Sequence, residues 1–263
     1  MGNLDYEYLD FEINENIALL SINRPKALNA INVEVLSELG AAVETLAGEQ
    51  DVRAMILTGA GDRSFVAGAD IAQMSDYSEA EAKTFASQGH HVLAAIEALP
   101  FPVIAAVNGF ALGGGCELAL ACDLILASEN AKFGQPEVKL GLIPGMGGCI
   151  RLPRKIGHAA ACEWIFSAQV YDAQQAKDVG LVREVLPLDK LLDRAKELAG
   201  MMAKQGPLAV AAAKKVIYST AVLNTAQAGE VEVDAFAALF NTADTKEGTR
   251  AFVEKRHANF QGK

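Results

Sequence analysis

Residues 107–123 read Val107-Asn108-Gly109-Phe110-Ala111-Leu112-Gly113-Gly114-Gly115-Cys116-Glu117-Leu118-Ala119-Leu120-Ala121-Cys122-Asp123; residues 133–137 read Phe133-Gly134-Gln135-Pro136-Glu137, and residues 141–148 read Gly141-Leu142-Ile143-Pro144-Gly145-Met146-Gly147-Gly148. The apolar run before this stretch, Pro102 to Val107, predicts a buried strand. Beyond the three glycines, Leu118, Ala121 and Cys122 recur at the spacing of one helix face. A strand, a glycine turn and a helix can aim backbone N–H groups at a negative charge, and glycine lets a ligand approach the main chain.

Two glutamates, Glu117 and Glu137, belong to this stretch and stand beside glycine or proline. Taken alone, a glycine triplet is also an ordinary turn, and an acidic residue in the first turn of a helix suits the helix dipole. Local spacing therefore leaves both a structural and a functional interpretation open.

The stretch as a whole resembles the enoyl-CoA hydratase, or crotonase, family. Three further motifs follow the family's order, so that the resemblance runs nearly end to end: Asn23-Arg24-Pro25-Lys26-Ala27-Leu28-Asn29-Ala30, Ser64-Phe65-Val66-Ala67-Gly68-Ala69-Asp70-Ile71 and Ala251-Phe252-Val253-Glu254-Lys255-Arg256. Each motif is weak evidence by itself, whereas the ordered set is specific. The resemblance implies an α/β fold, a spiral of repeated ββα units with a C-terminal helical region.

Composition limits the alternatives. Half of the 263 residues are hydrophobic, which is enough for a large core. A formal charge of −10 argues against nucleic acid or an anionic membrane as the main partner. The four cysteines show neither metal-ligand spacing nor a disulfide framework, so we expect reduced thiols. Met1 to Asp10 lacks a targeting pattern, and no apolar run has the length of a membrane span, so we expect a cytoplasmic protein.

Periodicity along the chain predicts strand, strand, helix, strand, helix, strand, helix in the first half. We expect a hairpin of Tyr8–Ile13 with Ile17–Ile22, and a helix capped by Asn32 whose buried face carries Val35, Leu36, Leu39, Val43 and Leu46. We also expect a short helix from Gly147 that stops at Pro153, a strand at Val182–Val185, and helices from Leu188 onward, one of which starts at Pro207. The predicted division is 1–200, an α/β core with the active site, and 201–263, a helical oligomerisation region.

By resemblance, two backbone N–H groups, those of Ala69 and Gly114, polarise a thioester carbonyl and hold an enolate. Glu117 and Glu137 match the family's two catalytic glutamates. We assign Glu117 to deprotonate the water that attacks Cβ, and Glu137 to exchange the proton at Cα. The implied reaction is reversible hydration of a short-chain 2-trans-enoyl-CoA, such as crotonyl-CoA, as in the β-oxidation of fatty acids. The acyl-CoA is the substrate, and no permanently bound cofactor or metal is expected.

The resemblance also implies CoA contacts. These are Lys26, Ala27, Ala67, Gly68, Asp70, Ile71 and Ala72 in the chain itself, with Phe252 and Lys255 reaching the site of a neighbouring subunit. Many relatives carry lysine where this chain has Ala72, and threonine and glutamine where it has Cys149 and Ile150. CoA affinity and acyl specificity are therefore left open by the sequence.

Other functions are weighed against this interpretation. An enoyl-CoA isomerase needs no nucleophilic water, and retention of both glutamates favours the hydratase. An RNA-binding or scaffolding relative would need the basic, aromatic-interleaved patch that an acidic chain lacks. Dehydrogenase and serine-hydrolase motifs are missing. By resemblance we expect a homo-oligomer, a trimer or a dimer of trimers, and the apolar 231–240 helix supports association.

Overall fold

The computed structural model describes residues 6–263, so the predicted N-terminal stretch Met1 to Asp10 lies partly outside it. The strands are β1 (Leu9–Asn14), β2 (Ile17–Ile22), β3 (Ala54–Gly59), β4 (Ser64–Val66), β5 (Val103–Val107), β6 (Phe110–Leu112), β7 (Leu124–Ser128), β8 (Lys132–Gly134), β9 (Tyr171–Asp172) and β10 (Glu184–Leu186). The helices are α1 (Val33–Gly48), α2 (Ile71–Met74), α3 (Glu79–Ala98), α4 (Gly114–Leu120), α5 (Gly148–Ile156), α6 (His158–Ser167), α7 (Ala173–Asp178), α8 (Leu188–Ala203), α9 (Pro207–Ser219), α10 (Thr225–Leu239) and α11 (Ala243–Glu254). Two 3-10 turns are η1 (Pro25–Ala27) and η2 (Glu137–Leu140).

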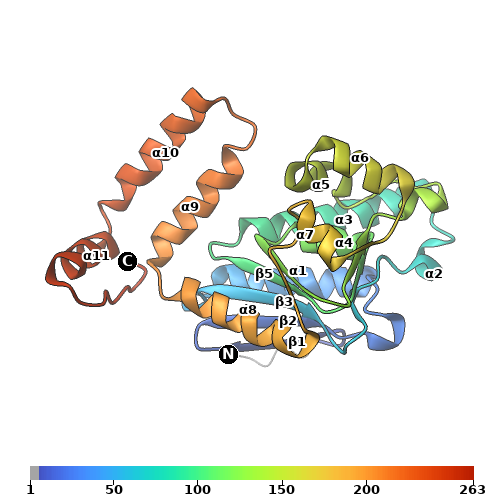
Figure 1. Ribbon diagram of the computed structural model, residues 1–263, viewed down its shortest axis with the longest axis horizontal. Coiled ribbons are helices and arrows are strands. Elements are labelled where there is room, and N and C mark those ends of the chain that lie inside the picture. Colours follow the sequence, from blue (N-terminus) through green and yellow to red (C-terminus); the bar gives the residue numbers. More distant parts are fainter. Residues whose placement is uncertain (1–5) are drawn as a thin grey trace.

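Within residues 6–263 the strands form two sheets (Figure 1). The larger has the order β1-β2-β3-β5-β7-β10, and the smaller has the order β4-β6-β8-β9. Successive ββα units place their first strands, β3, β5 and β7, in the larger sheet and their second strands, β4, β6 and β8, in the smaller. The predicted spiral of ββα units is confirmed, as is the hairpin of β1 with β2. The second strands have only three residues each, too few to show a period in sequence.

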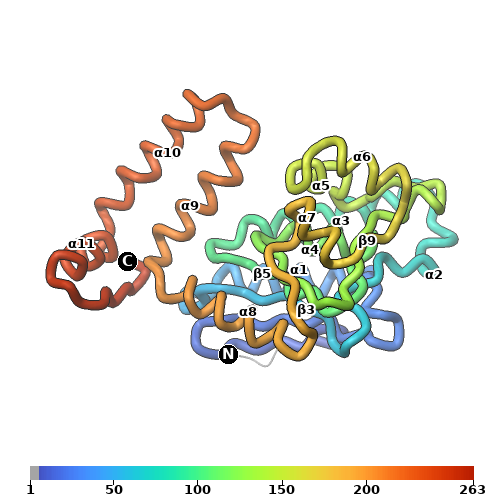
Figure 2. Tube along the Cα trace, in the orientation of Figure 1, coloured from blue at the N-terminus to red at the C-terminus, as the bar shows by residue number. Residues whose placement is uncertain are grey.

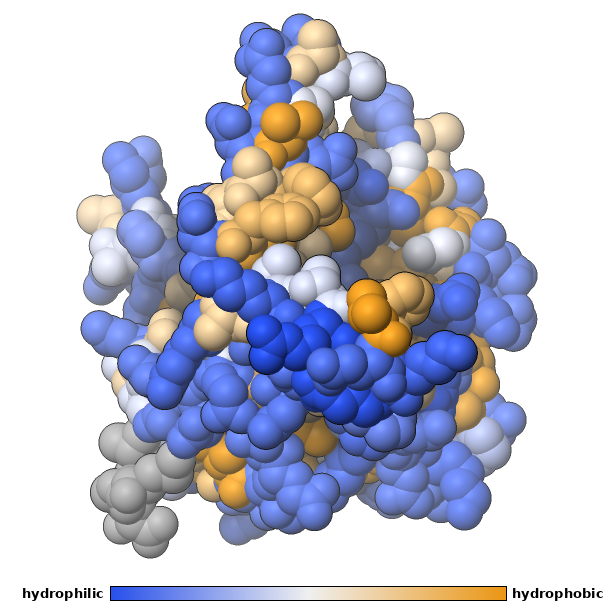
Figure 3. Space-filling view, turned by 90° about the vertical axis from the view of Figure 1, so that its left-hand side faces the viewer, coloured by the Kyte–Doolittle hydropathy of each residue, from blue (hydrophilic) through white to orange (hydrophobic). Residues whose placement is uncertain are grey.

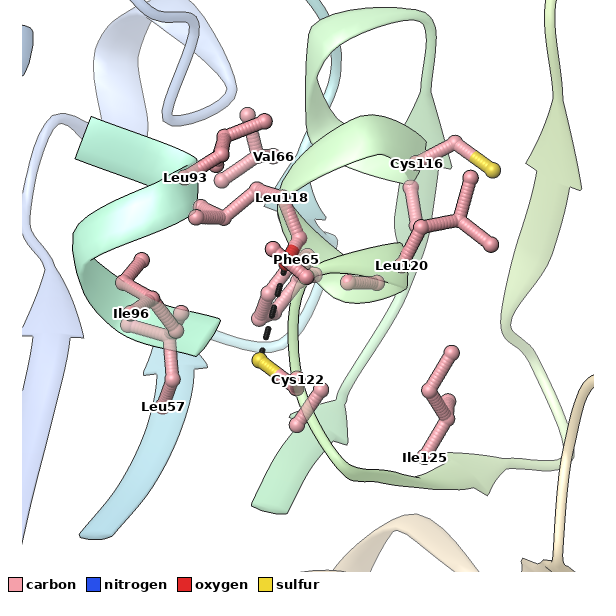
Figure 4. Close-up of a cluster of buried hydrophobic side chains, with 14 of the residues drawn as sticks. Leu57, Phe65, Val66, Leu93, Ile96, Cys116, Leu118, Leu120, Cys122 and Ile125 are labelled. Atoms are coloured by element: carbon pink, nitrogen blue, oxygen red, sulfur yellow. Dashed lines mark hydrogen bonds between the residues drawn. The ribbon is translucent and has the colours of Figure 1, made fainter. Parts of the chain in front are cut away.

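The larger sheet is covered on both faces, which explains its continuous apolar strands. Successive side chains of a strand point to opposite faces. Met55 and Leu57 of β3 join the main core, whereas Ala54 and Ile56 face α8. Figure 4 shows part of the main core, where Phe65 and Leu93 lie next to Leu118 of α4, and Leu57 lies next to Ile96 of α3. The helix that begins at the second glycine of the triplet is thus fixed by buried side chains.

Several local predictions are confirmed and two are wrong. The Asn32 side chain accepts a hydrogen bond from Val35 N at 2.9 Å, and the predicted apolar face of α1 is buried. Pro153 does not end α5, which continues to Ile156 with the proline inside the helix; packing of α5 on α4 and α6 offsets the hydrogen bond that proline cannot donate. The strand expected at Val182–Val185 lies at Glu184–Leu186, because pairing with β7 sets its register.

The C-terminal helices leave the body of the molecule after α8, which still packs on the larger sheet (Figures 1 and 2). Proline at the first position of α9 is confirmed. The helices α9 and α10 run side by side and project outward, with α11 near their base (Figure 2). Figure 3 looks onto this side and shows apolar residues among the polar ones. Phe236 is 63% exposed and Phe240 57% exposed, and their rings meet edge to face as the i to i+4 spacing predicts.

No helix within residues 6–263 combines the length and the apolar character needed to cross a membrane.

Candidate active site

A cavity of about 270 Å³ brings together Ala69, Gly114, Glu117 and Glu137, which come from three separate segments of the chain. Its wall comes from the segment after β4, the start of α4, the turn η2, the 142–146 loop and one side of α3. Ala67, Gly68 and Ile71 also line it, as expected for the predicted substrate contacts. The geometry therefore gathers the predicted catalytic groups into one place.

Two N–H groups at this cavity are left free by the backbone pairing around them. An isolated β-bridge pairs Ile31 with Ala69: Ile31 N donates to Gly68 O at 2.8 Å, and Asp70 N donates to Ile31 O at 2.7 Å. The bridge therefore uses the groups on either side of Ala69 and not the N–H of Ala69 itself. Gly114 is the first residue of α4, where an N–H has no acceptor within the helix. The position of a Cβ on Gly114 lies 3.6 Å from Ala69 N, so the two amides are neighbours.

Glycine is required at Gly113 and at Gly115 for different structural reasons. Gly113 has φ +49°, a conformation that favours glycine, and the position of its missing Cβ lies 2.6 Å from Glu137 Oε1. A Cβ on Gly115 would overlap the carbonyl oxygen of Val66, so α4 can pack this closely on β4 only with glycine there. Of the three glycines only Gly113 has a positive φ, because α4 begins immediately after it.

Glu117 is 1% exposed and is held by the backbone. Its Oε1 accepts from Met146 N and from Gly148 N, both at 2.7 Å. Burial raises the pKa of this carboxyl, and the two N–H groups act in the opposite direction. Both bonds end on the same oxygen, and no hydrogen bond from the described residues reaches Oε2.

Glu137 lies opposite, in the first turn of η2. Burial, followed by the charge of Glu117, raises the pKa of the Glu137 carboxyl to about 7. In one of its two amide orientations, the Gln135 nitrogen lies 3.2 Å from Oε1 and 3.3 Å from Oε2 and can donate to either. The two glutamates therefore sit in different environments, the arrangement that lets one carboxyl act as a base and the other as an acid.

Buried asparagines of the sequence motifs hold the loops around the cavity. Asn29, fully buried, donates to Ala60 O at 3.0 Å and to Ser64 O at 2.9 Å, while its oxygen accepts from Arg24 N. Asn108 donates to Gly59 O and Gly61 O. These crosslinks fix the approach to Ala69.

Several predicted contacts lie outside the cavity. Arg24, from the motif that contains Lys26, pairs with Asp70 at 2.8 Å, and this ion pair lowers the pKa of the Asp70 carboxyl. Asp70 also caps α2. Lys26 and Ala72 are exposed, and Ala27 is half-buried in the adjacent turn η1.

The predicted C-terminal contacts also lie outside the cavity, as do two positions at which this chain departs from the family pattern. Phe252 is 86% exposed on α11, and Lys255 caps that helix in a left-handed conformation. Neither lines the cavity of its own chain. Cys149 and Ile150 are exposed at the start of α5.

Sequence reasoning missed the groups that orient Glu117. Met146 and Gly148 were quoted only as part of a motif, and Arg151 with its partner Glu97 was not singled out. The signal available was an arginine three residues after the Gly147-Gly148 pair, but its carboxylate lies 54 positions away, which no local pattern reveals.

Fold and site together define a class: a crotonase-type spiral of ββα units whose cavity holds two carboxyls and an adjacent pair of N–H groups. The model of the protein family described as Enoyl-CoA hydratase/isomerase matches residues 12–263. The chain belongs to this enoyl-CoA hydratase/isomerase family.

Relatives and solved structures agree with this assignment. The crotonyl-CoA hydratase of Syntrophomonas wolfei is 48% identical over 258 residues, 98% of this chain and 99% of the relative. The short-chain-enoyl-CoA hydratase of Clostridium acetobutylicum is 45% identical over 240 residues, 91% and 92% of the two chains. The crystal structure of an enoyl-CoA hydratase from Bacillus anthracis matches with a TM-score of 0.95 at 37% identity, over 98% of this chain and all of that one.

Proposed function

We propose that this protein is an enoyl-CoA hydratase, a hydro-lyase that adds water reversibly to a short-chain 2-trans-enoyl-CoA such as crotonyl-CoA. One observation carries the proposal: Glu117, Glu137 and the backbone at Ala69 and Gly114 converge on one cavity. The named activities of the Syntrophomonas and Clostridium relatives support the same reaction.

In the proposed mechanism the thioester oxygen lies between the N–H groups of Ala69 and Gly114. Glu117 takes a proton from water while the water oxygen bonds to Cβ, and the electrons of the double bond move to the enolate held by the two N–H groups. Glu137 then delivers its proton to Cα, and the product is the 3-hydroxyacyl thioester. Solvent exchange returns one proton to Glu137 and removes one from Glu117. Donors aimed at charge that develops only in the transition state contribute a few kcal/mol, about 3 for each.

A short acyl chain fits the remaining wall of the cavity. Its apolar side chains include Met74, Phe85, Leu142, Ile143 and Met146. A volume of about 270 Å³ lies just below the range of roughly 300–1,000 Å³ for ordinary ligand pockets. An isomerase needs no nucleophilic water. Its reaction therefore would not explain why the backbone binds one oxygen of Glu117 and leaves the other for a water.

The remaining contacts complete the proposal. Lys26, Ala27, Asp70 and Ala72 border the CoA path, with Asp70 acting through its pair with Arg24. The exposed positions of Phe252 and Lys255 support their use at the site of a neighbouring subunit, in a trimer or a dimer of trimers. All four cysteines are free, which supports a cytoplasmic location.

Loss of the absorbance of the conjugated thioester, followed with crotonyl-CoA and with longer enoyl-CoAs, tests the function. We expect turnover to be fastest with the shortest substrates. Absence of hydration with every chain length, from a folded protein, would refute the proposal.

A further inference from the structure

An ion pair on the far side of the 145–148 turn has no role in the mechanism above. Arg151 Nε donates to Glu97 Oε1 at 2.8 Å, and Arg151 Nη2 donates to Glu97 Oε2 at 2.7 Å. This two-bond geometry fixes the plane of the guanidinium. Arg151 is 8% exposed, and Glu97 comes from the last turn of α3.

The third guanidinium nitrogen reaches the turn that holds Glu117. Arg151 Nη1 donates to Met146 O at 2.9 Å, and the N–H of the same Met146 donates to Glu117 Oε1 at 2.7 Å. Between Met146 and Gly148, Gly147 has φ +113°, and a Cβ there would overlap Arg151 Nη1. A continuous series of hydrogen bonds therefore runs from Glu97 through Arg151 and Met146 to Glu117.

We propose that Arg151, oriented by Glu97, is a positioning residue that fixes the Met146–Gly148 turn so that both of its N–H groups end on one oxygen of Glu117. The inference rests on the hydration proposed above. Neither Arg151 nor Glu97 lines the substrate cavity; both line a separate cavity of about 520 Å³ between α9 and the body. Their effect on the reaction is therefore exerted through the turn and not by contact with substrate.

Charge gives the pair a second effect with a definite sign. The positive charge of Arg151 lowers the pKa of Glu117, against the increase caused by burial. The other ionisable groups around Glu117 are Cys116 on its own helix, Glu137 from η2, Cys149 from α5, and His90 of α3 beside Gly147. Removing the positive charge should move protonation of Glu117 to higher pH, and removing the Glu97 charge behind it should move protonation to lower pH.

The test compares wild type with Arg151→Met, Arg151→Lys and Glu97→Gln in the hydration of crotonyl-CoA. It measures kcat, KM and the acid limb, which is the fall of kcat/KM on the acid side of its pH profile. For Arg151→Met we expect kcat to fall about 10- to 100-fold, the effect of a misplaced catalytic group, with KM changed less than about threefold because no substrate contact is lost. Its acid limb should move to higher pH. Arg151→Lys should restore the limb, because the charge remains, and only part of kcat, because a lysine cannot make the two-bond pair. Glu97→Gln should move the limb to lower pH.

Arg194→Met is a matched control. Arg194 makes the same two-bond geometry with Glu184, at 2.9 and 2.8 Å, between α8 and β10. It should leave kcat and the acid limb unchanged. If circular dichroism shows that Arg151→Met does not fold, the other two variants test the inference. Glu97→Gln should then shift the acid limb to lower pH, and Arg151→Lys should keep the wild-type limb with a reduced kcat.

Two results would overturn the inference: wild-type kcat in folded Arg151→Met, or limbs that move in the same direction in the Arg151→Met and Glu97→Gln variants. Absence of turnover in wild type and in Arg194→Met is a different result, because it refutes the proposed function itself.

Discussion

Hydration should depend on pH through Glu137. Burial and the charge of Glu117 raise the pKa of the Glu137 carboxyl to about 7. The active pair carries one proton, and it must be on Glu137 for delivery to Cα, so activity is present below this pKa and is lost as the pH rises through it. A group with a pKa of about 7 is roughly 90% protonated at pH 6 and roughly 10% at pH 8, so kcat/KM should fall about tenfold over this range.

Glu137→Gln removes the group that titrates. An amide has nearly the same shape and cannot deliver a proton, so we expect kcat to fall by roughly 10²–10⁴-fold, the range for general acid–base groups. The remaining activity should lack the limb near pH 7. Glu44→Gln, at an exposed position of α1, makes the same chemical change away from the cavity and should behave as wild type.

The assay is the loss of thioester absorbance with crotonyl-CoA, from pH 5.5 to 9 at constant ionic strength and with low substrate, so that it reports free-enzyme ionisations. A wild-type profile that is flat between pH 6 and 8 would refute the reasoning from burial. A Glu137→Gln profile that keeps the same limb would assign the limb to another group.

Three further predictions concern the other parts of the site. Glu117→Gln should fold normally and lose roughly 10²–10⁴-fold in kcat; near-normal hydration by the purified variant contradicts its role as base. Gly114→Pro removes one N–H at the first position of α4, where proline is tolerated, and should raise the barrier by at least about 3 kcal/mol; an active variant whose circular dichroism is unchanged would show that this N–H is not used. Removal of residues 225–263 exposes the partner face of α9 and should give a smaller, aggregation-prone species with weaker CoA binding; sedimentation measures this, and an intact protein that is a fully active monomer at micromolar concentration rules out a shared site.

Much of the fold could be predicted because its signals are local. The cap at Asn32, the apolar face of α1 and the proline that starts α9 each depend on residues within a few positions of one another. The three-residue strands β4, β6 and β8 could not be predicted, because their stability comes from neighbours in the second sheet. Pro153 gave the wrong boundary because α5 continues past it while packed on α4 and α6, and the sequence does not show this packing.

For the candidate site, the motifs named the residue types and the family resemblance supplied their roles. Glu117, Glu137, Ala69 and Gly114 were all singled out, and the fold brings them to one cavity. Arg24 illustrates what a motif cannot show, since its charge is engaged by Asp70, 46 residues along the chain and 2.8 Å away in space. An arginine in a loop looks the same in sequence whether it meets a phosphate or a carboxylate.

The sequence alone determined which residues are candidates for the site, because the ordered motifs and their resemblance to the family can be recognised from residues that are close together in the chain. Tertiary structure alone decided how those groups behave. The high pKa of Glu137, the two N–H groups on Glu117 Oε1 and the Glu97–Arg151 pair behind them depend on segments that meet only after folding. Burial and long-range hydrogen bonding set charge and orientation, and neither is encoded by residues adjacent in the chain.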